Sequence, residues 1–257
     1  MMDFVLPPVV AVLVWWLGTG GVMLLDRLPR DSWRYTLGTA TTVVAAALVC
    51  IARSADNTTT AGAYAGFVCA VVAWGWHELT FLAGWITGPR RSGCSEPSHW
   101  PTRLRESVQA ILWHEIGILL MLALIAMLTW NRANPVALWT FGLLWTMRLS
   151  AKLNLFLGVR NWGEQFLPPQ LAYLPSYFNR RSLNMLLPVV LVAGTAVLAW
   201  LIHLAADASG GQRAALLLVA SMGVLAIAEH LLMVLPLQST ALWRWAMRRH
   251  AEAMAAR

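Results

Sequence analysis

Residues 111–130 read ILWHEIGILLMLALIAMLTW, and this stretch decides the class of fold. The hydrocarbon core of a bilayer is about 30 Å thick, and an α-helix crosses it in about 20 predominantly apolar residues. The stretch has that length, and His114 and Glu115 are its only ionisable pair. We therefore predict that it belongs to a membrane-spanning helix over residues 106–130.

Further apolar segments of similar length occur along the whole chain, at 4–25, 36–52, 63–87, 136–158, 185–206 and 213–240. The chain is 58% hydrophobic and only 12% charged, whereas soluble domains carry about 25% charged residues. The sequence predicts an all-α integral membrane protein, a bundle of about seven transmembrane helices forming one domain over residues 1–257. Residues 241–257 are expected to form a short basic cytoplasmic tail. Prolines in residues 159–182 exclude one long helix there and predict an interfacial or re-entrant stretch.

The basic residues predict the orientation of the bundle. Fourteen of the 19 Lys and Arg residues fall on one side of the predicted helices, at 27, 30, 34, 90, 91, 103, 105, 160, 180, 181, 244, 248, 249 and 257. Cytoplasmic loops collect Lys and Arg, so this side is expected to be cytoplasmic, with the N-terminus periplasmic and the C-terminus cytoplasmic. Because the basic residues sit at helix ends rather than on one continuous patch, the net charge of +7 does not indicate nucleic-acid binding.

Ionisable residues within the apolar segments are the strongest functional signal. Such groups are unfavourable in hydrocarbon and are kept where they pair, bind a ligand or relay protons. They are His77 and Glu78, His114 and Glu115, Arg148 and Lys152, and Glu229 and His230. His77, His114 and His230 are about ten, eight and ten residues from the predicted cytoplasmic helix ends, so we expect one shared polar site in that half of the bilayer.

Three interpretations of this site remain open. In the first, the carboxylates only neutralise Arg148 and Lys152. In the second, the site holds a metal such as non-haem iron, with the candidate ligands Glu78, His114, Glu115, Glu229 and His230. In the third, it holds a quinone, a porphyrin or a chlorin, with candidate binding residues His77, Trp74, Trp113, Arg148, Lys152 and Asn154. No nucleophilic or phosphate-binding motif is visible, so no catalytic residue is predicted.

Many of the tryptophans, Trp15 among them, sit near segment ends, a position typical of the aromatic belts of membrane proteins. Trp74 and Trp113 instead lie at membrane depth beside the ionisable residues, where they could line a flat apolar ligand.

Several blocks of the chain resemble the PuhE family of photosynthetic complex assembly proteins of purple phototrophic bacteria. These blocks are WGWHELTFLAGWITGPRR (74–91), ILWHEIGIL (111–119), LLWTMRLSAKLNLFLGVRN (143–161), EQFLPPQLAYLPSYFNRRSLNMLLP (164–188) and AEHLLMVLPL (228–237). The resemblance implies a bacterial inner-membrane protein with a role in reaction-centre assembly and bacteriochlorophyll supply. It carries no established catalytic residues.

The function expected from residues and resemblance together is that of a membrane accessory or assembly subunit of the bacterial photosynthetic apparatus. Its expected partners are the lipid bilayer and another photosynthesis-related membrane protein or bacteriochlorophyll-pathway enzyme. The alternative is a redox or cofactor-binding subunit, holding iron, quinol or a tetrapyrrole such as a bacteriochlorophyll precursor, that supports an oxidase such as the di-iron cyclase of bacteriochlorophyll synthesis.

Overall fold

The computed structural model describes residues 2–96, 99–163 and 167–235, so the predicted tail at 241–257 lies outside the described residues. The described residues form seven long helices, of 22 to 29 residues each. They are α1 (Met2–Leu25), α2 (Trp33–Ser54), α3 (Thr60–Leu82), α4 (Trp100–Leu128), α5 (Val136–Leu157), α6 (Leu186–Asp207) and α7 (Gly210–Leu232).

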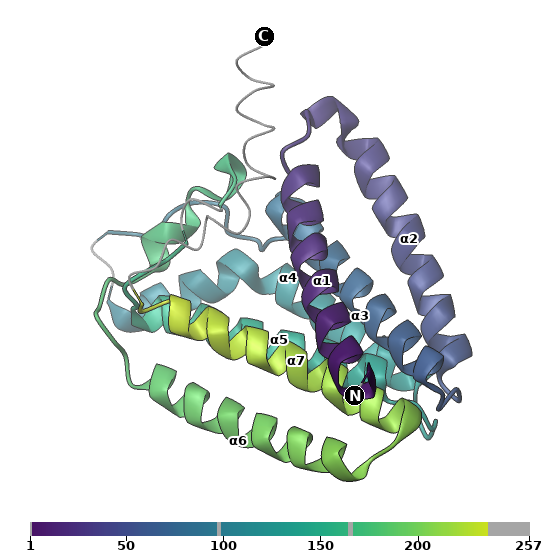
Figure 1. Cartoon of the computed structure of the whole chain (residues 1–257). Coiled ribbons are helices and arrows are strands. Elements are labelled where there is room, and N and C mark those ends of the chain that lie inside the picture. The colour runs from purple at the N-terminus through teal and green to yellow at the C-terminus, as the bar shows by residue number, and fades with distance from the viewer. Residues whose placement is uncertain (1, 97–98, 164–166, 236–257) are drawn as a thin grey trace, which may run out of the picture.

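Helix α3 is the centre of the bundle and contacts α1, α2, α4, α5 and α7. Helix α1 packs mainly on α7, while α2 and α6 lie on the flanks, against α3 and α7 respectively (Figure 1). The helices draw together near the N-terminus and the α6–α7 turn, and they diverge toward the opposite end (Figure 1). Small residues on the buried face of α3, such as Ala70 and Ala73, are fully buried and allow this close packing.

Six of the helices are long and apolar enough to cross a membrane, as in a multi-pass membrane protein. Helix α5 is not among them, because it carries Arg148 and Lys152 together with the polar residues Ser150 and Asn154. Its neighbours α3, α4 and α7 supply the partners that these groups require. The predicted all-helical fold is therefore confirmed at the level of a helical membrane protein, and the number of helices that span the bilayer stays a prediction.

The connections between helices differ in length at the two ends of the bundle. The loop at residues 26–32 and the described parts of the loops at 83–99 and 158–185 share one end, which we call the long-loop end. The turns at 55–59, 129–135 and 208–209 share the other, where Arg132 forms an ion pair with Asp56. All the described basic residues predicted to be cytoplasmic lie at the long-loop end, so the charge asymmetry is built into the fold.

Helix α7 ends at Leu232 rather than at 240. Two other helix boundaries depart from the expected ones for local reasons. Helix α3 ends at Leu82 rather than at 87, because Gly84 adopts a positive φ of 75°. The Gly84 N–H donates to the carbonyl of Phe81 and the Trp85 N–H donates to that of Thr80, which is the hydrogen-bond pattern of a Schellman cap. Helix α4 begins at Trp100 rather than at 106, since Pro101 occupies its first turn, where proline is favoured.

Candidate functional site

Both cations of α5 form ion pairs with carboxylates on neighbouring helices. The Arg148 guanidinium donates to Glu78 on α3, with Nη2 and Oε2 3.1 Å apart. The Lys152 ammonium donates to Glu115 on α4 at 2.5 Å, and the indole N–H of Trp145 also donates to Glu115, at 3.4 Å. Three helices thus contribute to one network, in which each cation has its own counter-ion.

Glu229 on α7 differs from the other two carboxylates because it has no cation of its own at hydrogen-bond distance among the described residues. Its Oε1 accepts a hydrogen bond from the indole N–H of Trp15 on α1, at 3.1 Å. The side chain is exposed, while the adjacent His230 is only 2% exposed. The charge of Arg148 also acts on Glu229, so this carboxylate belongs to the same electrostatic cluster.

These side chains meet in a cavity of about 720 Å³. Its walls come from α1, α3, α4, α5, α7 and two loop segments, at residues 161–163 and 167–178. The lining is mostly apolar and includes the aromatic side chains Trp15, Trp74, Phe81, Trp145, Phe156 and Trp162. The ionisable residues that line the cavity include Glu78, Glu115, Arg148, Lys152, Glu229 and His230. Ligand pockets in proteins typically enclose about 300–1,000 Å³ with a few polar groups in an apolar lining, and this cavity fits that description.

Two of the three histidines lie behind the cavity instead of lining it. His77 and His114 are 2% and 0% exposed, and their ring centroids are 6.4 Å apart between α3 and α4. The His114 ring packs on Phe81 at 4.4 Å, and no nitrogen of either ring has a hydrogen-bond partner in the part of the chain that the structure describes. Within these two His–Glu pairs, the carboxylate faces the cavity and the imidazole faces the helix packing.

His230 has partners on both ring nitrogens. Its Nδ1 lies 2.8 Å from the carbonyl oxygen of Ala226, which can only accept, so Nδ1 carries a proton. Its Nε2 lies 2.6 Å from the hydroxyl of Ser150 on α5. The ring therefore ties the last turn of α7 to α5 beside the cavity.

The predicted site residues divide into two groups. The cavity brings together Trp74, Glu78, Glu115, Arg148, Lys152, Glu229 and His230. It does not include His77, His114, Trp113 or Asn154. Trp113 is 51% exposed on the outside of α4, and Asn154 is fully buried, where its side-chain N–H donates to the carbonyl of Ser150.

A metal centre gains no support from the arrangement of these groups. Among the described residues, no three His, Cys, Asp or Glu side chains are close enough together to hold a metal ion. Two of the carboxylates are already engaged by Arg148 and Lys152. Metal ligation by Glu78, His114, Glu115, Glu229 and His230 therefore stays a prediction.

The depths estimated from the sequence were inaccurate for individual residues. His77 lies five residues before the end of α3 at Leu82, and His230 lies two residues before the end of α7 at Leu232, against about ten expected for each. His114 lies fourteen residues into α4, against eight expected, because α4 begins at Trp100. The ion pairs nevertheless join α3, α4 and α5 at one level.

A family model described as a protein of unknown function, DUF3623, matches residues 1–254. The chain belongs to this family. It is also 38% identical over 239 residues to a protein of Rhodobacter capsulatus described as an uncharacterized 30.4 kDa protein in the puhA 5′ region. That match covers 91% of this chain and 87% of the relative. No solved structure matches the chain.

Sequence reasoning missed Trp15, which the aromatic-belt interpretation had placed at the membrane interface. In this DUF3623 chain its indole N–H instead donates to Glu229, and the ring lines the cavity. The sequence offered little indication of this contact, because Trp15 and Trp16 are adjacent and lie in an apolar segment without ionisable residues between 4 and 25.

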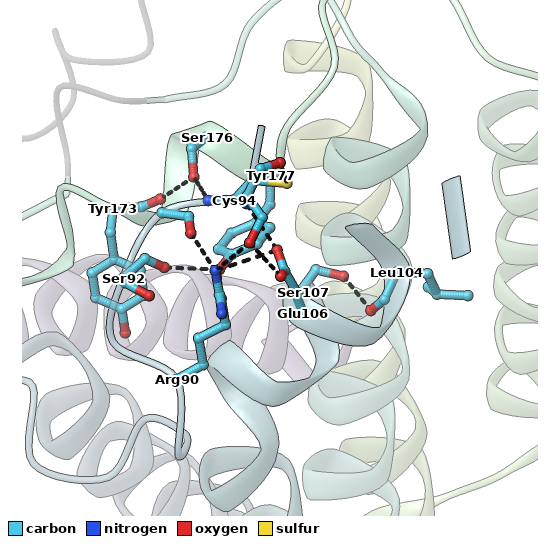
Figure 2. A network of polar contacts seen from close by, with 11 residues as sticks. Arg90, Ser92, Cys94, Leu104, Glu106, Ser107, Tyr173, Ser176 and Tyr177 are labelled. Carbon is cyan, nitrogen blue, oxygen red and sulfur yellow. Dashed lines mark hydrogen bonds and ion pairs between the residues drawn. The ribbon is translucent and has the colours of Figure 1, made fainter. Parts of the chain in front are cut away.

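A second polar network at the long-loop end was also missed (Figure 2). Arg90 donates from Nε to the Tyr177 hydroxyl at 2.8 Å and pairs with Glu106 at 3.4 Å. Burial raises the pKa of the Tyr177 phenol, so the hydroxyl keeps its proton at neutral pH and donates it to the carbonyl of Ser92, at 2.8 Å.

The same network fixes the 158–185 loop to the loop between α3 and α4. The hydroxyl of Ser176 accepts a hydrogen bond from the Cys94 N–H at 2.8 Å, and Ser95 donates to Glu106 from both its N–H and its hydroxyl. Because Tyr177 and its neighbours Leu174 and Phe178 line the cavity, this network holds one wall of the cavity in place.

Proposed function

We propose that this protein is an accessory membrane protein of the bacterial photosynthetic apparatus, acting in bacteriochlorophyll supply or reaction-centre assembly. Two findings support the proposal. The first is the resemblance of the His–Glu, Arg–Lys and proline-rich blocks to PuhE. The second is the 38% identical relative, whose name places it in the puhA 5′ region.

The molecular role is proposed to be the binding of a membrane-soluble ligand in the cavity between α1, α3, α4, α5 and α7. The observation that carries this role is Glu229, an exposed carboxylate that lines a largely apolar cavity and has no cation of its own within the described part of the chain. A chain that needed only to neutralise Arg148 and Lys152 would need two carboxylates, and Glu78 and Glu115 already serve. An additional carboxylate among apolar helices is unfavourable unless it pairs, binds a ligand or relays protons, and we propose that Glu229 binds a ligand.

The proposed location is the bacterial inner or intracytoplasmic photosynthetic membrane, with the long-loop end on the cytoplasmic side. The proposed partner is another photosynthesis-related membrane protein or a bacteriochlorophyll-pathway enzyme. The long-loop end offers structured polar segments for such a contact, since the network around Arg90 and Tyr177 orders both long loops there.

The second candidate is a redox or cofactor-binding subunit that supports an oxidase. It is favoured by His77 and His114, whose four ring nitrogens are buried beside the charged cluster without a hydrogen-bond partner among residues 2–96, 99–163 and 167–235. An optical spectrum and metal analysis of the purified protein separate the two candidates. Stoichiometric iron or a tetrapyrrole spectrum supports a redox subunit that holds one of these groups, and the absence of both after purification in mild detergent contradicts that form of the candidate.

Deletion of the gene in its native phototroph tests the accessory role. We expect lower reaction-centre absorbance per unit of membrane, or accumulation of bacteriochlorophyll precursors, with recovery on complementation by the wild-type gene. Complementation with Glu229→Gln should fail in part, while Glu96→Gln, the same change on an exposed loop residue, should restore the wild-type level. Unchanged pigment and reaction-centre levels in the deletion strain would refute the role.

A further inference from the structure

The charges that line the cavity do not balance. Among the described residues, the cavity-lining carboxylates are Glu78, Glu115 and Glu229, and the cavity-lining cations are Arg148 and Lys152. The two ion pairs leave one negative charge, on Glu229. A ligand with further negative charge would be repelled, and this repulsion is strong in a cavity with a largely apolar lining.

Glu229 also has hydrogen-bonding capacity to spare. A carboxylate offers about four acceptor sites, and the Trp15 indole supplies one donor, to Oε1. The side chain is exposed, so a bound molecule can reach it. The complementary group on a ligand is therefore a hydrogen-bond donor, such as a hydroxyl.

Arg148 presents the opposite chemistry in the same cavity. Glu78 engages Nη2, and 44% of the Arg148 side chain remains exposed. A guanidinium carries five N–H donors, so Arg148 can also donate to a ligand oxygen. The cavity thus offers an acceptor and a donor to one ligand.

The walls favour a flat ring. Trp15, Trp74 and Trp145 line the cavity beside Glu229 and Arg148, and aromatic faces bind planar ligands well. A volume of about 720 Å³ accommodates a substituted aromatic headgroup and part of an apolar tail.

We infer that the cavity binds a neutral aromatic ring that carries hydroxyl donors, the chemistry of a membrane hydroquinone. One hydroxyl donates to Glu229, and a ring oxygen accepts from Arg148. The inference rests on the proposal that this cavity is a ligand site, and it names the class of ligand. It concerns binding alone and assigns no electron transfer to the protein.

A dicarboxylic tetrapyrrole is the main competitor for the same walls. Its two carboxylates would add two negative charges to a cavity in which the two described cations, Arg148 and Lys152, are already neutralised by Glu78 and Glu115, so neutralising the ligand would require those pairs to break. Breaking such pairs strands the carboxylates. The hydroquinone requires neither change.

The test compares a hydroquinone with its dimethyl ether, which lacks the hydroxyl hydrogen-bond donors, and with the competing tetrapyrrole. The full-length protein in lipid nanodiscs is titrated, without oxygen, with a short-tailed hydroquinone, with its dimethyl ether and with protoporphyrin IX, and binding is followed by quenching of tryptophan fluorescence. We expect the hydroquinone to bind at least tenfold more tightly than its ether, a difference of about 1.4 kcal/mol. This comparison needs no mutant protein.

Glu229→Gln then tests the residue, with Glu96→Gln as the matched control. We expect the preference for the hydroquinone over its ether to fall severalfold in Glu229→Gln and to persist in Glu96→Gln. Equal binding of hydroquinone and ether, an unchanged preference in Glu229→Gln, or tighter binding of protoporphyrin would each overturn the inference. The accessory role would stand if only these titrations fail, and it would fall if deletion of the gene leaves the photosynthetic complexes unchanged.

Discussion

Replacing Lys152 by methionine should destabilise the protein far more than the same change at Arg132. Lys152 and Glu115 are 18% and 17% exposed, so loss of the ammonium strands a largely buried carboxylate. Removing one partner of a buried pair costs about 3–5 kcal/mol. We expect the lower end, about 3 kcal/mol, because Trp145 still donates to Glu115. Arg132 and Asp56 are 53% and 64% exposed, and such a surface pair contributes about 0–1 kcal/mol.

Reversible unfolding in mixed detergent micelles measures both free energies, with helicity as the signal. The single variant Glu115→Gln and the double variant Lys152→Met/Glu115→Gln complete a double-mutant cycle. Replacing both members of a buried pair leaves no stranded charge. We expect the double variant to be more stable than Lys152→Met alone. If Arg132→Met is as damaging as Lys152→Met, or if the double variant loses the sum of the two single losses, the account of the α5 network is wrong.

Three further predictions address the fold. Alkaline phosphatase fused after residue 210 should be active and fused after residue 95 inactive, and the reverse pattern would invert the proposed topology. Gly88→Ala should sharply lower the amount of folded protein, because a Cβ there would lie 1.9 Å from the carbonyl oxygen of Gln109, whereas Gly21→Ala, with nothing within 4 Å, should not. Burial raises the pKa of Asp26 to about 6, so its contribution to stability is fully present below about pH 4 and is lost as the pH rises through 6. Asp26→Asn should remove this dependence from the pH profile of unfolding and stabilise the protein above pH 7 by about 3 kcal/mol.

The sequence by itself determined the class of fold, because the length of an apolar run is set by the thickness of the bilayer. The same reasoning found the ionisable groups that line the cavity, since a charged residue in an apolar segment stands out at any position. Helix ends were less accurate. The apolar segment continues through Trp85 and Ile86, so hydropathy alone predicts that the helix continues. Hydropathy does not detect that Gly84 caps α3.

Only the tertiary structure decided which member of the His77–Glu78 and His114–Glu115 pairs faces the cavity. Adjacent residues on a helix diverge by about 100°, and the sequence does not show which direction faces the neighbouring helices. The packing of α3 against α4 turns His77 and His114 inward and leaves Glu78 and Glu115 for the cations of α5. The tertiary structure likewise decided the role of Trp15, because its contact with Glu229 joins residues that are 214 positions apart in the sequence. Pattern and propensity act over a few neighbouring residues, whereas a cavity is made by side chains that only the folded arrangement of helices brings together.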